Sequence, residues 1–536
     1  ARAHDTTGAP PSGYIPASGT PSGCSGGASS GGFTPNQYLT AYGFDPLHAA
    51  GASGGGERVA LIEIDGFKES DIVAFARCFG LDVPPITVFE VGSRRQLPPG
   101  GESTLDLEVL SAAAPRLDHI QVYENNGNAA DVDKSFVLPL IHPGAKPPIV
   151  SASLGLCEPE MVQAFGAAGI RSSESSMQLA AATGITVLAS SGDEGSADCK
   201  DQNGNVIDHL AVNYPSSSPW VTGVGGTNLQ LAATNAIQGE DIWNDTTAAL
   251  AAGGGGLSAV FGRPSYQRDV VSQNARVVPD VAMLADEAPG YAIYCTAVPD
   301  CVSGPGGNPW QQIGGTSAAT PLLAGGLALI DQDLRRHERE TVGFANPLLY
   351  AVGVHEAQIQ AQIGASVFND VVTGSNDVGP YIPGGDGQPL GCCTAAPGFD
   401  AASGWGSVNL SALDQVALQA LPAYGRVSLS IPRPQHPVAQ RALRVHLTCS
   451  SACSTYAFAV LTLGRHHEFT VKSAHYRFAR PTARTIPIRF SPGQERRLRA
   501  AVAAPLRVEA EAFAVALDTR GQVAKVTAGR AMRVIG

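Results

Sequence analysis

The chain has 536 residues, of which 44% are hydrophobic and only 15% are charged. This composition excludes a chain that is disordered throughout, because disorder requires low hydrophobicity and many charges. No apolar run approaches the roughly 18 residues that a membrane-spanning helix needs. The 62 Gly and 38 Pro indicate many turns and long loops. At roughly one domain per 100–200 residues, the length predicts two to four domains.

The charge is distributed unevenly along the chain. The formal net charge is −12, yet residues 423–536 carry 18 Lys and Arg against 5 Asp and Glu. The remaining residues carry 17 Lys and Arg against 42 Asp and Glu. We expect the acidic part not to bind nucleic acid, whereas the basic segment suits an anionic surface or the acidic part of the chain itself.

The ten cysteines are even in number, and several lie close together in the sequence. Cys295 is near Cys301, Cys392 is next to Cys393, and Cys449 is near Cys453. No Cys and His residues have the spacing of a zinc site. We therefore predict an exported protein with disulfides, one of them joining Cys449 to Cys453, and leave the rest of the pairing open. The first residues lack the basic and apolar stretches of a signal peptide, so we expect that any signal peptide has been removed or was never part of this sequence.

Taken in chain order, the sequence begins with a Gly-, Ser- and Pro-rich stretch at 1–32, which predicts an irregular arm. Farther along, short Val- and Ile-rich runs alternate with helical patterns. Strands are predicted at 58–64, 86–91, 119–123, 148–154 and 186–191, and helices at 70–79, 103–113, 133–140 and 161–182. This alternation predicts an α/β fold in which helices cover both faces of a parallel sheet.

The C-terminal part has a different pattern, with seven short β-like runs separated by turns. They lie at 426–431, 443–447, 455–463, 467–471, 485–490, 506–517 and 523–527. Such spacing predicts an all-β sandwich domain. The sequence thus predicts an arm at 1–32, an α/β domain at 33–422 and a basic β-sandwich domain at 423–536.

Two polar residues lie where predicted elements begin or end. Ser317, in GGTSAATP (314–321), opens an apolar helix. A Ser at a helix N-terminus lies in a positive field beside free backbone N–H groups, which suits a nucleophile but also an ordinary helix cap. Asp193 follows a strand in a turn flanked by glycines. A turn Asp is the plain alternative there.

Glu102 and Asp106 are four residues apart, so a helix places both carboxylates on one face. A solvated acidic face near a helix N-terminus is one interpretation. However, Leu105, Val109 and Leu110 make the same helix apolar, which favours partial burial of the pair. Two carboxyls that share a buried site are a common way to tune an acid–base group.

In combination these segments resemble the sedolisin family of serine-carboxyl peptidases. Besides the motifs above, the similar stretches are FTPNQYLTAY (33–42), LIEIDG (61–66), YPSSSPWVTGVGGT (214–227), GGGGLSAVFGRPSYQ (253–267) and VPDVA (278–282). They occur in the family's order over roughly residues 33–415. The resemblance implies a subtilisin-like α/β catalytic domain with a Ser-Glu-Asp triad.

The resemblance also implies roles for four residues. Ser317 would be the nucleophile, Glu102 the general base, and Asp106 the group that orients Glu102. Asp193 would line the oxyanion hole, and it must be protonated to donate a hydrogen bond there. A carboxyl base and a protonated carboxyl donor work together best at acid pH, so we expect an acid-acting enzyme.

Further positions match the family or depart from it. Glu63 corresponds to a glutamate that extends the network behind the triad. Gly314 replaces the usual first Ser of the nucleophile motif, and Leu154 replaces a Trp that acidic members often carry. The Leu154 replacement concerns the extended network and not the triad.

The resemblance further implies one structural Ca²⁺ ion. Asp370 and Asp400 would supply carboxylates, and Val371, Ala396 and Gly398 would supply carbonyls. Ca²⁺ takes six to eight oxygen ligands of these kinds. The insertion at 374–393, which contains the adjacent cysteines, is unusual.

Other protein classes fit less well. A subtilisin-type protease needs a His in a His-Gly-Thr context, which His119, His142 and His209 lack. The two GxSxG matches, at 27–31 and 51–55, lack the strand that precedes a nucleophile elbow. No HExxH zinc motif occurs. The remaining alternative is a non-catalytic protein of the same fold whose basic sandwich binds anionic surfaces.

The expected partners follow from these assignments. We expect a secreted monomer that acts on proteins or peptides and whose inhibitory N-terminal propeptide is absent from this chain. The sequence leaves endopeptidase and tripeptidyl-peptidase action both open.

Overall fold

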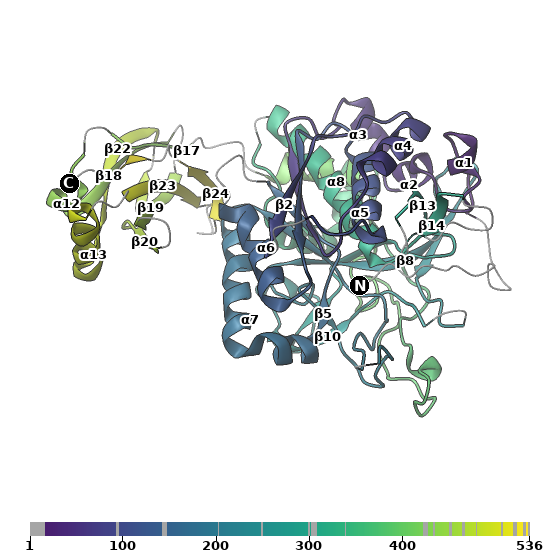
Figure 1. The fold of residues 1–536 in the computed structure, drawn as a ribbon. Helices are drawn as coiled ribbons and strands as arrows, with labels where there is room; N and C mark the ends of the chain where they lie inside the picture. The colour runs from purple at the N-terminus through teal and green to yellow at the C-terminus, as the bar shows by residue number, and fades with distance from the viewer. Residues whose placement is uncertain are drawn as a thin grey trace. The chain divides into compact units, whose positions relative to one another are not determined.

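The structure, a computed structural model, describes most of the chain. The described residues are 17–92, 96–141, 147–201, 203–247, 250–297, 301, 308–337, 339–421, 427–432, 435–449, 453–463, 467–478, 480–504, 508–517, 523–528 and 532–533. Residues 1–16 of the predicted arm, His142 and residues 426, 506 and 507 of two predicted strands lie outside them. The chain divides into two compact units, and nearly all of the second lies within Leu421–Gly536 (Figure 1).

The larger unit is built on a ten-stranded sheet with the order β15-β16-β12-β8-β6-β4-β1-β3-β2, and β9 pairs with β8. The strands from β16 to β2 pair in parallel, whereas β15 and β9 are antiparallel to their partners. The bounds are β1 Arg58–Glu63, β2 Ile86–Val91, β3 His119–Asn125, β4 Ile149–Ala152, β6 Thr186–Ser190, β8 Thr222–Leu231, β9 Ile237–Ile242, β12 Val281–Leu284, β15 Phe368–Asn369 and β16 Ser407–Val408.

Helices cover both faces of this sheet, as the alternating pattern predicts (Figure 1). Their bounds are α4 Glu69–Phe79, α5 Gly101–Ala113, α6 Ala129–Ile141, α7 Glu158–Ala182, α8 Thr316–Arg336 and α11 Leu410–Ala420. The even-numbered residues Ala60, Ile62 and Ala152 pack in one apolar cluster with side chains of α6 and α7. Because alternate strand residues face opposite sides, Glu63 and Ser153 point toward α5 and α8 on the other face.

Shorter elements connect these layers. They are α1 Ser25–Ala28, α2 Pro35–Ala41, α3 Phe44–Ala49, β5 Leu156–Cys157, β7 Asn213–Tyr214, β10 Gly256–Gly262, η1 Ser265–Gln267, β11 Ala275–Val278, β13 Tyr291–Tyr294, β14 Trp310–Ile313, α9 Asn346–Val354, α10 Glu356–Ile363 and η2 Gly379–Tyr381. Among the described residues, no helix is long and apolar enough to cross a membrane.

All ten cysteines form disulfides, and the predicted Cys449–Cys453 bond is present. The Cys295–Cys301 and Cys392–Cys393 bonds join the other close pairs. Two longer links, Cys24–Cys78 and Cys157–Cys199, tie segments that sequence spacing did not associate.

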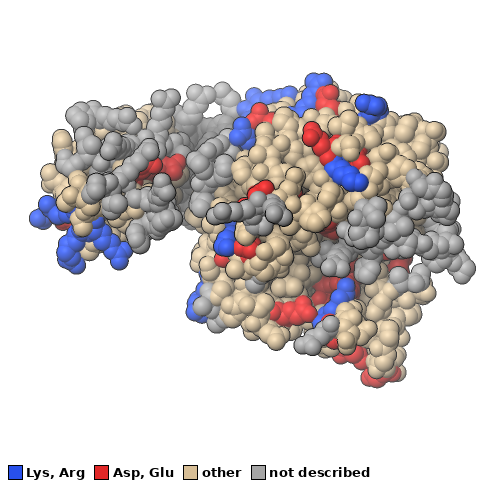
Figure 2. Space-filling view, in the orientation of Figure 1, with Lys and Arg blue, Asp and Glu red and all other residues tan. Residues whose placement is uncertain are grey.

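The second unit consists of two antiparallel sheets around one apolar core. One sheet contains β17 Val427–Ser430, β18 Ala442–Cys449 and β22 Thr482–Arg489; the other contains β19 Cys453–Leu463, β20 His467–Lys472, β21 Tyr476–Phe478, β23 Val508–Leu517, β24 Val523–Ala528 and β25 Met532–Arg533. Each of the seven predicted strands has a counterpart, while β21, β25 and two helices, α12 Pro437–Gln440 and α13 Pro492–Ala503, were not predicted. Figure 2 shows Lys and Arg gathered on the α13 side of this unit.

Candidate active site

Ser317 lies at the N-terminus of α8, the helix that runs along the centre of the sheet. The helix is buried from Thr316 to Leu334, and Ser317 itself is 0% exposed. The first backbone N–H groups of a helix have no intrahelical acceptor and carry a partial positive charge. Gly315 precedes the helix with φ +105°, a conformation that disfavours other residues. A negative charge that forms beside Ser317 would therefore be stabilised.

Glu102 and Asp106 lie on α5, all of whose residues are buried. The solvated acidic face is thus excluded, and burial is complete rather than partial. The carboxylate of Asp65, two residues after β1, caps this helix by accepting hydrogen bonds from the backbone N–H groups of Glu102 (3.2 Å) and Ser103 (2.9 Å). Gly100 is required beside it, since a Cβ there would lie 1.8 Å from Asp65 Oδ2.

The hydroxyl of Ser153 links the carboxyl pair on α5 to helix α8. Ser153 Oγ lies 2.7 Å from Asp106 Oδ2 and 3.0 Å from the carbonyl oxygen of Ser317. Ser317 Oγ meets no hydrogen-bond partner of good geometry among the described residues, yet it lies near enough to Glu102 to lower the pKa of that carboxyl. In sites without substrate such bonds are often long.

Burial sets the protonation of this group. Desolvation raises the pKa of Glu102 and of Glu63 well above ordinary values, and the charge of Asp106 adds to both shifts. Desolvation also raises the pKa of Asp106 to about 8, although hydrogen bonds with Ser153 and Glu63 oppose the rise. At pH values where exposed carboxyls are ionised, these three carboxyls therefore do not all ionise, and protons are retained within the group.

Asp193 lies just beyond β6 and contacts the first residue of α8. Its Oδ1 accepts hydrogen bonds from the backbone N–H and the hydroxyl of Thr316, each at 2.8 Å. Burial raises the pKa of Asp193, and the neighbouring charge of Glu194 raises it further. Burial also acts to raise the pKa of Glu194, but a hydrogen bond with Asp198 and an ion pair with Lys200 lower it to about 2. An ionised Glu194 thus favours the protonated form of Asp193.

The structure therefore places the four candidate residues around one helix N-terminus. Sequence reasoning missed Asp65 and Ser153, although both lie in stretches singled out for other reasons. It also noted Gly314 as a departure, and here a Cβ would lie 2.2 Å from the carbonyl oxygen of Asp286, so the local backbone accepts only glycine. Glu63 does reach the network, because its Oε2 accepts a hydrogen bond from Ser103 Oγ at 3.1 Å.

An apolar cavity of about 160 Å³ opens next to these residues. Ile64 follows Glu63 in the chain and Leu154 follows Ser153, so the cavity begins at the same two strand ends but on the α6 and α7 side of the sheet. The cavity is completed mainly by side chains of α6 and α7, namely Val132, Phe136, Phe165, Ser173 and Met177. Leu154 is the residue that stands where the family often has Trp.

The candidate calcium residues come together at one loop. Asp370 Oδ2 accepts a hydrogen bond from Gly398 N (2.8 Å), and Asp400 Oδ2 accepts one from Ala396 N (2.9 Å). The side chain of Val371 is buried in an apolar cluster, which leaves only its carbonyl for a cation. Among the described residues, no group of three or more His, Cys, Asp or Glu is arranged as a metal site. Two carboxylates with backbone carbonyls are a donor set that fits Ca²⁺.

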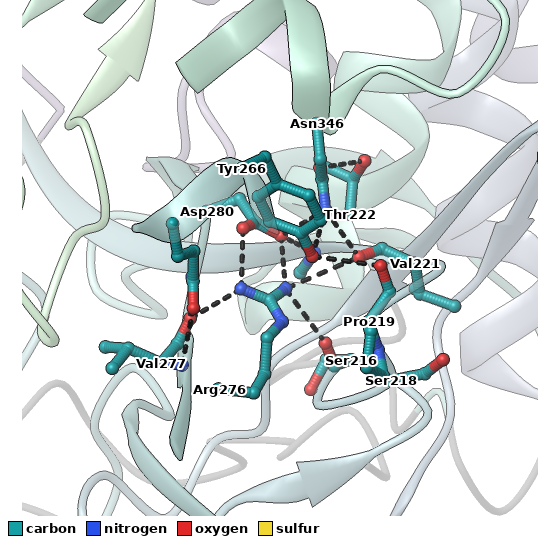
Figure 3. A network of polar contacts seen from close by, with 12 residues as sticks. Ser216, Ser218, Pro219, Val221, Thr222, Tyr266, Arg276, Val277, Asp280 and Asn346 are labelled. Carbon is teal, nitrogen blue, oxygen red and sulfur yellow. Dashed lines mark hydrogen bonds and ion pairs between the residues drawn. The ribbon is translucent and has the colours of Figure 1, made fainter. Parts of the chain in front are cut away.

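A second buried cluster contains an ion pair and its hydrogen-bond partners (Figure 3). Arg276 and Asp280 are both 0% exposed and meet at 2.6 Å. Asp280 also accepts hydrogen bonds from Gly223 N (2.8 Å) and Tyr350 Oη (2.8 Å). Burial acts to lower the pKa of Arg276, but the charge of Asp280 outweighs it, so the guanidinium stays charged. This cluster ties β8, β11 and α9 together.

Comparisons with known proteins agree with this geometry. Residues 120–404 match the family model described as the subtilase family. Kumamolisin from Bacillus sp. (strain MN-32) is 33% identical over 390 residues, covering 70% of this chain and 62% of its own length. Human tripeptidyl-peptidase 1 is 31% identical over 369 residues, covering 65% of this chain and 57% of its own length. The chain thus spans about three fifths of the length of these relatives.

A solved structure adds to the match. Pseudomonas sedolisin, a serine-carboxyl proteinase complexed with two molecules of pseudo-iodotyrostatin, superposes with a TM-score of 0.59 at 25% identity, covering 73% of this chain and 98% of that chain. The chain therefore belongs to the subtilase family. Within it, the protein is a member of the sedolisin family, as the motifs indicated. In the described part of the chain, the hydrogen bonds of the site involve carboxyls, hydroxyls and backbone groups, with no histidine.

Proposed function

We propose that this chain is a serine-carboxyl peptidase that hydrolyses peptide bonds through an acyl-enzyme on Ser317. The observation that carries the proposal is the Ser153 hydroxyl, which lies against both Asp106 and the Ser317 backbone. Through this contact the serine at the helix N-terminus lies next to the buried carboxyl pair. Asp193 is hydrogen-bonded to Thr316, the residue that precedes this serine. A serine, a base and an oxyanion donor are the three parts that acyl transfer requires.

In the proposed reaction, ionised Glu102 accepts the proton of Ser317 Oγ as that oxygen bonds to the substrate carbonyl carbon. The carbonyl π electrons move to the oxygen, which the protonated Asp193 and the α8 N-terminus stabilise. Glu102 then gives the proton to the leaving amine as the C–N bond breaks. Water hydrolyses the acyl-enzyme by the same steps, and Asp106 holds Glu102 in place throughout.

The proposed mechanism requires Glu102 ionised while Asp193 is protonated. The product of these two fractions is largest between the two pKa values and falls on either side. Above both pKa values Asp193 is a carboxylate that repels an oxyanion, so activity is lost as pH rises. We therefore propose an enzyme that works in acid and loses activity in alkali.

We also propose that the apolar cavity receives a side chain of the peptide substrate. Its walls are mainly apolar, although Asp133, Ser173 and Tyr214 also line it, so an apolar side chain fits it better than a charged one. Leu154→Trp should fill much of the cavity and lower kcat/KM for substrates with large apolar side chains, while substrates with small ones lose less. An equal loss for both would show that the cavity does not bind substrate.

One structural Ca²⁺ ion is proposed for the loop that Asp370 and Asp400 share. When bound, the ion cross-links this loop and takes no part in bond cleavage. Asp370, Asp400 and the carbonyls of Val371, Ala396 and Gly398 would hold it.

Disulfide formation suits an oxidising compartment, so we propose that the protein is secreted. We further propose that residues 33–422 are the catalytic domain and that the enzyme is a monomer. The basic residues 423–536 would then form an accessory domain; exposed Arg496, Arg497 and Arg499 on α13 suit anionic surfaces.

The direct test is hydrolysis of a peptide mixture at acid pH by the full chain and by its Ser317→Ala variant, with mass spectrometry of the acid-quenched enzyme. We expect cleavage by the wild type and an acyl adduct on the peptide that contains Ser317. The variant should lose at least about 10⁴-fold in kcat/KM. Equal cleavage by both proteins would overturn the proposal, and a non-catalytic binding protein would be the remaining interpretation.

A further inference from the structure

Asn376, on the insertion at 374–393, is 0% exposed and uses all of its polar groups. Its side-chain amide nitrogen donates to the carbonyl oxygens of Gly253 (3.0 Å) and Gly255 (3.3 Å). Its side-chain oxygen accepts from Cys393 N at 2.8 Å. Its backbone carbonyl accepts from Ser196 N at 2.9 Å. The proposed reaction gives Asn376 no role.

These contacts converge on the segment that carries Asp193. We call residues 192–196 the Asp193 loop and residues 252–255 the glycine strip. The backbone N–H of Ala252 donates to the carbonyl of Asp193 (2.9 Å), and that of Gly254 donates to Gly192 (2.7 Å). In return the N–H of Gly195 donates to Ala252 (2.9 Å). Backbone hydrogen bonds therefore pair the two segments side by side.

Asn376 holds both segments from one side. Its amide group bonds the glycine strip, and its carbonyl bonds the Asp193 loop. The fit is close, because a Cβ on Gly195 would lie 2.4 Å from the Asn376 carbonyl oxygen. The Asp193 carboxyl itself accepts hydrogen bonds from the backbone N–H and the hydroxyl of Thr316, at the start of α8. The position of the Asp193 carboxyl relative to Ser317 thus depends on how Asn376 holds its backbone.

We propose that Asn376 is a positioning residue that holds the Asp193 carboxyl where it can donate to the oxyanion. The inference rests on the proposed function of Asp193. An oxyanion donor acts over a few tenths of an ångström, so a small displacement lowers the rate without changing substrate binding. A residue with a purely structural role would instead change stability and leave the catalytic rate of the folded protein unchanged.

The matched control is Asn346, which is also 0% exposed. Its side chain makes a similar set of bonds, donating to Val221 O (2.9 Å) and accepting from Thr222 Oγ1 (2.6 Å), but in the Arg276 cluster. Asn376→Ala and Asn346→Ala are therefore compared in the full chain. We expect Asn376→Ala to lose about 10- to 100-fold in kcat with KM within about twofold. Asn346→Ala should lose stability and keep kcat.

A second measurement separates stabilisation of the oxyanion from ordinary binding of the peptide. A peptide aldehyde gains affinity when Ser317 Oγ adds to its carbonyl carbon, the Ser proton leaves to Glu102 and the carbonyl oxygen becomes the oxyanion. The corresponding peptide alcohol forms no such bond. For Asn376→Ala, affinity for the aldehyde should fall by the same factor as kcat, and affinity for the alcohol should stay unchanged. Equal loss of both affinities, or unchanged kcat, would overturn the inference.

If Asn376→Ala does not fold, Asn376→Asp serves instead, since a protonated Asp keeps one donor and one acceptor. The titratable groups around it are Asp377 on its own loop and Asp193, Glu194 and Asp198 on the facing one, with Lys200 paired to Glu194. As pH rises, a carboxylate at 376 would repel the carbonyls of Gly253 and Gly255. The ratio of variant to wild-type aldehyde affinity should therefore fall with pH, and a constant ratio would overturn the inference. A wild type that fails to bind the aldehyde more tightly than the alcohol would instead overturn the proposed function itself.

Discussion

Two clusters of buried ionisable side chains in the larger unit offset the energetic cost of burying charge in opposite ways. In one, Asp280 is paired with Arg276 and accepts further hydrogen bonds from Gly223 and Tyr350 (Figure 3). In the other, Glu63 and Asp106 have no ion-pair partner among the described residues and share their surroundings with Glu102 and hydroxyl groups. Arg276 in the first cluster stays charged, whereas carboxyls of the second cluster hold protons.

This difference distinguishes a cluster that stabilises the fold from one whose groups can exchange protons. A buried charge that is paired and fully hydrogen-bonded holds elements together and has little tendency to exchange protons. Buried carboxyls without a cation have raised pKa values, as the value of about 8 for Asp106 illustrates. Such groups cost stability when ionised, and proton exchange is what a serine nucleophile requires of them.

The largest effect is expected for Glu102→Gln. The amide cannot accept the Ser317 proton, so kcat/KM should fall by at least about 10³-fold. The fold should be retained, because the amide removes a buried acid whose ionised form is unfavourable. Peptide hydrolysis and thermal unfolding of the same preparation check both parts. A variant with more than a tenth of wild-type activity would exclude Glu102 as the base.

Removal of the cation from the other cluster should change stability instead. Arg276→Met leaves Asp280 buried without its charge partner, which costs about 3–5 kcal/mol of unfolding free energy. The kcat of the folded fraction should stay near the wild-type value, because Arg276 makes no contact with Ser317 or its carboxyls among the hydrogen bonds of the described residues. Denaturant unfolding gives the stability, and a variant as stable as the wild type would show that the cluster is not a structural link.

Asp106→Asn should change how stability depends on pH. Because folding raises the pKa of Asp106 from 3.8 to about 8, its stabilising contribution is complete below about pH 4 and is lost as pH rises through about 8. The Asn variant lacks this loss, so its stability relative to the wild type should increase toward alkaline pH. Unfolding midpoints across this range measure the trend, with the more exposed Asp118→Asn as control. Parallel curves for Asp106→Asn and wild type would contradict the assignment.

The smallest effect concerns the proposed calcium loop. Chelation of Ca²⁺ should lower the melting temperature of the wild type by a few degrees, since loss of a ligand that binds only the folded state removes its stabilisation. Asp370→Ala should melt at the chelated value and no longer respond to added Ca²⁺. An identical response of the variant and the wild type to Ca²⁺ would place the ion elsewhere or exclude it.

The α/β layers could be read from the sequence because periodic apolar runs report directly on which face is buried. Ser317, Glu102 and Asp106, the residues proposed here to be catalytic, could be selected from the sequence because each lies in a local pattern. Asp65, Ser153 and Asn376 were missed, since each acts on a residue at least 37 positions away, as Asp65 does on Glu102. Helix α13 had a local signal that went unused: Ser491 and Gln494 form a capping box with Pro492 in the first turn.

The most direct test of the account is the pH dependence of kcat/KM, from about pH 2 to about pH 8, for the wild type and Asp193→Asn. The wild type should show a bell whose alkaline limb reports ionisation of a donor with a raised pKa. In Asp193→Asn, a neutral amide remains a donor at every pH, so activity should persist above the pH at which the wild type loses it. The same alkaline limb in both proteins would contradict the claim that a protonated Asp193 stabilises the oxyanion.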